Sequence, residues 1–144
     1  MAERLTPDEE DSALALESIR NRWGGIWQSE IAKRDSGKAG RLDMMGVSPD
    51  AVNLIDSDLA SSRPDKIIGA AIREINSQIN DIKADFKPGK SPEELSIASE
   101  RTINLELARG RLTKGNLGPL AEPKLFDATI NRINIELEQK NNTP

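Results

Sequence analysis

The hydrophobic positions of segment 64–86, PDKIIGAAIREINSQINDIKADF, recur at alternating spacings of four and three residues. The members of this series are Ile68, Ile72, Ile75, Ile79, Ile82 and Phe86. Such spacings place side chains on one face of an α-helix, and a series sustained over about three heptads is typical of a coiled coil. The pattern therefore predicts a central helix with one continuous apolar face, which we call the isoleucine seam.

The same periodicity predicts four more helices, over residues 7–33, 49–60, 92–112 and 124–139. In segment 92–112 the expected buried face comprises Leu95, Ala98, Thr102, Leu105 and Leu112, widened by Ile97, Ile103 and Leu107. Segment 110–123 contains three glycines and two prolines, so we expect a loop that Leu117 and Leu120 hold against the body. No segment alternates apolar and polar positions long enough to predict a strand.

These elements predict an all-α protein, a bundle of about five helices around the helix at 64–86. We expect a single domain over residues 1–144, with flexible ends at about 1–5 and 140–144. Gly24-Gly25 costs the first helix about 2 kcal/mol relative to alanine, which leaves a kink or break there as an open alternative.

Three helix starts share one signature, a hydroxyl residue followed by proline and an acidic residue, at Thr6-Pro7, Ser48-Pro49 and Ser91-Pro92. The hydroxyl is a good N-cap, and proline is well tolerated at the first helical position. Ser62-Arg63-Pro64 is a looser version before the central helix. The helix starts are therefore predicted by local chemistry as well as by periodicity.

The composition excludes several kinds of chemistry. The chain contains no Cys, His or Tyr, which rules out disulfides, the usual zinc sites, cysteine nucleophiles and Ser-His triads. No pair of carboxylates stands out, so we expect neither an enzyme nor a bound metal or cofactor. No apolar run of about 18 residues predicts a membrane span, and the N-terminus has no signal-peptide core. We expect a soluble, cytoplasmic or virion-type protein.

Tryptophan is the main candidate for molecular recognition. Trp23 and Trp27 are four residues apart in a chain with only two other aromatic residues, so they are either core anchors or a binding patch. Our hypothesis is a non-enzymatic protein–protein interaction module, such as an adaptor, chaperone, scaffold or assembly component, with a protein partner or a second copy as its ligand. The expected contact residues are Trp23, Ile26 and Trp27, followed by any exposed part of Ile68, Ile72, Ile75, Ile79 and Ile82.

Charge suggests an alternative hypothesis. The net charge is −4, but residues 1–19 carry −5 and residues 20–41 carry +4. The bases of the second segment are Arg20, Arg22, Lys33, Arg34, Lys38 and Arg41. They either contact nucleic-acid phosphates, as in a small regulator or packaging protein, or form a solvated or internally paired face. A second basic set, Arg109, Arg111 and Lys114, falls at a predicted helix C-terminus, where cations favour the helix dipole.

Overall fold

The computed structural model describes residues 6–35, 48–86 and 89–141, with side chains for these residues except 8, 26–35, 49 and 141. The described helices are α1 (Pro7–Asp35), α3 (Pro49–Leu59), α4 (Asp65–Ala84), α5 (Pro92–Thr113), the short 3₁₀ helix η1 (Gly118–Ala121) and α6 (Pro123–Asn141). No strand occurs in the described part of the chain, so the all-α prediction is confirmed. The predicted flexible end at 1–5, and residues 142–144 of the other predicted flexible end, lie outside the described residues.

The helix starts follow the predicted caps at three of four positions. The hydroxyls of Thr6, Ser48 and Ser91 each accept a hydrogen bond from the backbone N–H three residues on, at 3.2, 3.2 and 3.1 Å. The prediction that Ser62 caps the central helix is wrong, because α4 begins without a side-chain cap from its own N-terminal segment. Asp58 of the preceding helix accepts from the N–H of Ile67 at 2.7 Å instead.

The long first helix runs through Gly24-Gly25 without interruption. A Cβ at either position would meet nothing within 4 Å, so close packing does not explain these glycines. The helix packs against η1, and its described buried residues, Ala15, Leu16, Ile19 and Trp23, all precede the pair. The open alternative of a break at this point is therefore settled in favour of one helix.

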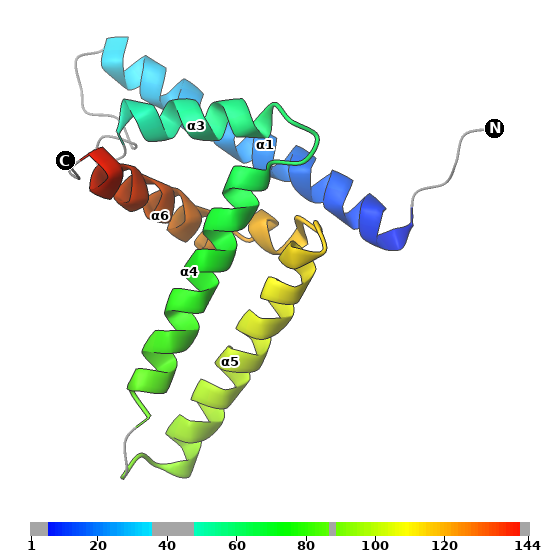
Figure 1. Cartoon of the computed structure of the whole chain (residues 1–144). Helices are drawn as coiled ribbons and strands as arrows, with labels where there is room; N and C mark the ends of the chain where they lie inside the picture. The colour runs from blue at the N-terminus through cyan, green and yellow to red at the C-terminus, as the bar shows by residue number, and fades with distance from the viewer. Residues whose placement is uncertain (1–5, 36–47, 87–88, 142–144) are drawn as a thin grey trace.

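Helix α4 occupies the centre of the fold and packs against α3, α5 and α6 (Figure 1). Its upper half lies among the other helices and buries Ile67, Ile68 and Ile75. One hydrophobic cluster joins residues from every described helix. Its larger members are Leu16, Ile19, Trp23, Val52, Ile55, Leu59, Ile67, Ile68, Ile75, Ile79, Leu112, Leu117, Leu120, Phe126, Ile130 and Ile133. Leu117 and Leu120 are 2% and 1% exposed, so they do hold the glycine-rich segment against the body.

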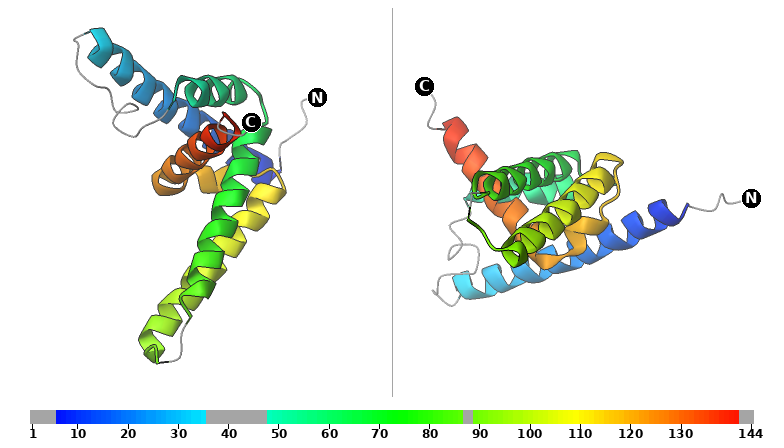
Figure 2. Two further views of the ribbon diagram at one scale, coloured as in Figure 1. Left: turned by 60° about the vertical axis from the view of Figure 1, so that its left-hand side comes forward. Right: turned by 90° about the horizontal axis from the view of Figure 1, so that it is seen from below.

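Helices α4 and α5 form an antiparallel hairpin whose outer end extends away from the other helices (Figure 2). Of the apolar residues of α5, Leu112 alone is fully buried, where the helix joins the body. The prediction that Ile97, Ile103 and Leu107 widen the buried face is wrong, because all three are more than half exposed. The outer part of α5 has only α4 to pack against, and one neighbouring helix covers only one face.

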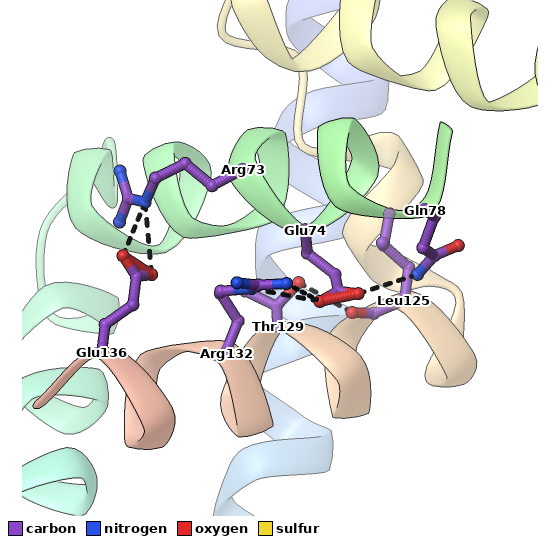
Figure 3. Close-up of polar contacts among 7 residues, drawn as sticks. All are labelled: Arg73, Glu74, Gln78, Leu125, Thr129, Arg132 and Glu136. Atoms are coloured by element: carbon purple, nitrogen blue, oxygen red, sulfur yellow. Dashed lines mark hydrogen bonds and ion pairs between the residues drawn. The ribbon is translucent and has the colours of Figure 1, made fainter. Parts of the chain in front are cut away.

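Polar contacts fix α6 across α4 (Figure 3). Glu74 of α4 accepts from Arg132 of α6 through Nη2 at 3.0 Å, and its other oxygen accepts from Gln78 at 3.1 Å. Arg73 and Glu136 form a second, more exposed ion pair at 2.8 Å. Each helix contributes one acidic and one basic residue to the two ion pairs, Arg73 and Glu74 from α4 and Arg132 and Glu136 from α6. These contacts therefore set the register in which α6 crosses α4.

Among the described residues, no helix is long and apolar enough to cross a membrane.

Candidate functional site

The isoleucine seam becomes progressively more exposed toward the outer end of the hairpin. Ile75 is fully buried and Ile79 is 4% exposed, whereas Ile82 is half-buried and Phe86 is 41% exposed. Nearer the body, Ile68 is buried and Ile72 is half-buried. The last two positions of the seam therefore lie where only α5 covers them.

A groove of about 650 Å³ lies between α4 and α5 at this outer end. Its apolar lining comes from Ile82, Phe86, Ile97 and Ala98. Its polar residues are Gln78, Asp81, Asp85, Lys90, Glu94 and Arg101. The acids Asp81 and Asp85 lie on the α4 side, while the α5 side carries both signs of charge, from Lys90, Glu94 and Arg101. An apolar floor between polar rims is the usual character of a surface that receives another polypeptide.

Exposed hydrophobic residues are concentrated on the hairpin. Seven large hydrophobic side chains are exposed among the described residues, and five of them fall between residues 86 and 107. These five are Phe86, Leu95, Ile97, Ile103 and Leu107. The other two, Leu14 and Ile135, are isolated on α1 and α6. Single exposed hydrophobics are normal on any protein, but a concentration on one projecting element is typical of a binding surface.

Lys90 lines the groove at the tip of the hairpin, where it contacts two acidic residues. Its ammonium group donates to Asp85 at 2.7 Å and lies 4.0 Å from Glu94. The hydrogen bond to Asp85 and the two negative charges together raise the pKa of Lys90 above the ordinary value of 10.5, although partial desolvation opposes them. The ammonium group thus stays charged at neutral pH and links the end of α4 to the start of α5.

The tryptophan hypothesis meets a different environment. Trp23 is 4% exposed, and its indole N–H donates to Asp56 of α3 at 3.3 Å. A buried tryptophan with its polar atom satisfied is a core anchor in this fold. The side chains of Ile26 and Trp27, the other two members of the predicted patch, lie outside the described residues.

The basic residues of segment 20–41 are described only at its start. Arg20 donates through Nε to the carbonyl of Leu59 at 2.7 Å, and Arg22 pairs with Asp127 of α6 at 3.1 Å. Both arginines therefore have partners within the fold. The side chains of Lys33 and Arg34, and all of Lys38 and Arg41, lie outside the described residues.

The chain matches no protein family model, no curated protein sequence and no solved structure. The candidate site therefore stands on its own geometry. Sequence reasoning identified the seam side of the groove through Ile82, but it assigned Ile97 to the buried face. The signal that could have corrected this is the spread of apolar residues around α5, which is wider than the one face that a single neighbouring helix can cover.

Proposed function

We propose that the protein is a non-enzymatic helical interaction module that binds a partner protein through the outer end of the α4–α5 hairpin. The observation that carries this proposal is the gathering of exposed apolar side chains on the α4–α5 hairpin, whose outer end extends away from the other described helices. Adaptor, scaffold, chaperone and assembly roles all use such a surface. The body, with its buried core and polar ties, supplies the rigid base from which the hairpin extends.

The chemistry of the groove favours an amphipathic helix as the ligand. Two antiparallel helices with an apolar groove between them receive a third helix, which extends the heptad packing of the isoleucine seam as in a short coiled coil. The ligand helix would place apolar residues at three- and four-residue spacings against Phe86 and Ile97. Its flanks would carry basic residues toward Asp81 and acidic residues toward Arg101.

The energetic contribution of this contact is modest but useful. Ile97 is 68% exposed and Phe86 is 41% exposed, so both have apolar area left to remove from water. Burying that area would contribute about 2–3 kcal/mol to binding. Loss of both side chains would accordingly weaken the complex by about 30- to 150-fold.

The test compares the size of the native complex in the source cells for three forms of the chain. We expect wild type to elute as a complex larger than one 15.8 kDa chain, and the Phe86→Ser/Ile97→Ser variant to elute as the free chain. Leu14→Ser is the matched control, because Leu14 is 65% exposed on α1, far from the groove. Elution of wild type as a free chain, or an equal loss of complex in the control, would contradict the proposal.

Sedimentation velocity of the purified chain identifies the kind of partner. A monomer at micromolar concentration fits a ligand helix from another protein. A dimer that Phe86→Ser dissociates would show that the groove is filled by a second copy of this chain, and would overturn the assignment to a different protein.

A further inference from the structure

A second pocket, of about 830 Å³, lies on the body where three segments meet. The first turns of α1, the connection between α3 and α4, and the turn between α5 and η1 form its walls. Buried Leu16 and Leu117 contribute to its floor. Its volume is within the range of ordinary small-molecule sites, and it is separate from the hairpin groove.

The charge of this pocket is opposite to that of the whole protein. Its lining contains four cations, Arg20, Arg63, Arg111 and Lys114, and one carboxylate, Glu9. The chain as a whole carries −4. Because the four cations come from three segments far apart in the sequence, the positive site exists only in the folded protein.

Helix-capping does not require the two cations at the end of α5. There, Gly115 adopts a positive φ of 87°, and the N–H groups of Gly115 and Asn116 donate back to the carbonyls of Leu112 and Arg111 at 2.9 Å each. This pair of bonds is a Schellman motif, which satisfies the last carbonyls from the backbone alone. Among the described residues, the side chains of Arg111 and Lys114 make no hydrogen bond or ion pair.

The other two arginines retain donors or charge as well. Arg20 donates to the neutral carbonyls of Leu59 and Ser61, and no carboxylate of the described residues pairs with it. Arg63 pairs with Asp65 through Nε at 2.9 Å, which leaves its Nη donors available. The pocket thus has an excess of positive charge, because its cations outnumber the carboxylates that lie near them.

Two glycines make room for the guanidinium groups beside the turn. A Cβ on Gly118 would come within 3.0 Å of the Arg111 guanidinium carbon, and a Cβ on Gly115 would lie 3.4 Å from that of Arg63. Each guanidinium group therefore rests against a backbone segment that carries no side chain. Such packing places the flat donor faces of both guanidinium groups beside the turn, where an anion can reach them.

We propose that this pocket binds a small oligophosphate ligand, with Arg63, Arg111 and Lys114 as its main phosphate contacts and Arg20 as supporting charge. Guanidinium groups recognise phosphate by paired, charge-assisted hydrogen bonds, and several adjacent cations favour an anion with several charges. The apolar floor leaves space for an organic group attached to the phosphates. This site is independent of the hairpin groove and of the function proposed for it.

The test is a titration of the full-length, ¹⁵N-labelled protein with sodium tripolyphosphate, followed by NMR. We expect saturable binding at one site, with the largest amide shifts at Gly115 and Gly118, and weaker binding of inorganic phosphate. Arg111→Ala/Lys114→Ala should weaken binding about tenfold or more, and Arg63→Gln should weaken it independently. The control is Lys83→Ala/Lys124→Ala, which removes the same charge from exposed positions outside the pocket.

Three results would overturn the proposal. The first is the absence of saturable binding up to about 1 mM tripolyphosphate. The second is an equal loss of affinity in the lysine control, which would assign the binding to overall charge. The third is equal binding of a short polyglutamate peptide, which would assign the pocket to acidic protein segments rather than to phosphate.

Discussion

At the scale of single residues, the polar contacts between helices differ in how strongly they stabilise the fold. Glu74 is 16% exposed in its side chain and accepts hydrogen bonds from both Arg132 and Gln78. Glu136 is 33% exposed and pairs with Arg73, which is itself 56% exposed. Water competes much more effectively for the second pair, so its contribution to stability is smaller.

Truncation of these two glutamates should therefore have unequal effects. We expect Glu74→Ala to lower the free energy of unfolding by about 1–3 kcal/mol, because it leaves a part-buried guanidinium group without its partner. Glu136→Ala should cost less than about 1 kcal/mol. Urea unfolding followed by circular dichroism measures both, and equal losses would contradict the ranking.

Lys90 gives a prediction about pH. Its pKa is raised, chiefly by the hydrogen bond to Asp85, so the charged form is favoured by folding. With Asp85 ionised, the contact therefore stabilises the hairpin tip from neutral pH up to about 10, and it is lost as the pH rises through the raised pKa of Lys90. In an NMR titration of the lysine ¹³Cε resonances, Asp85→Asn should move the Lys90 midpoint to lower pH. An unchanged midpoint would show that Asp85 is not the cause.

At the scale of elements, local chemistry explains where helices begin and end, and tertiary contacts explain which faces they bury. The caps at Thr6, Ser48 and Ser91 could be predicted because each uses neighbouring residues. The Asp58 contact at the start of α4 could not, because it comes from a different helix. The periodicity of α5 does not state how many neighbours the helix has, so the only sequence signal for the exposure of Ile97 is the wide spread of apolar residues around the helix.

The end of α5 gives a prediction in which one substitution has opposite effects at two glycines. Gly115 needs a positive φ, so Gly115→Ala should destabilise the protein by about 1–2 kcal/mol. Gly110 lies within α5 with nothing within 4 Å of its potential Cβ, so Gly110→Ala should stabilise by about 0.5–1 kcal/mol. Thermal unfolding distinguishes the two, and changes of the same sign would contradict the assigned backbone roles.

At the scale of the whole molecule, the fold divides the tasks of stability and contact. The body collects apolar residues from every described helix, whereas the outer hairpin is two helices thick and leaves apolar side chains exposed. The sequence predicted the central helix and its seam from periodicity. It could not show at which residue of the isoleucine seam burial by the other helices ends, nor that Arg63 and Arg111 line the same pocket. Both depend on contacts between segments that are distant in the sequence.

The most direct test of the hairpin as a binding surface is site-specific photo-crosslinking in the source cells. Benzoylphenylalanine in place of Ile97 reports on the groove, and the same residue in place of Leu14 reports on an equally exposed position elsewhere. We predict adducts with another polypeptide at position 97, lost when Phe86→Ser is added, and none at position 14. No adduct at position 97, or the same adducts at both positions, would contradict the assignment.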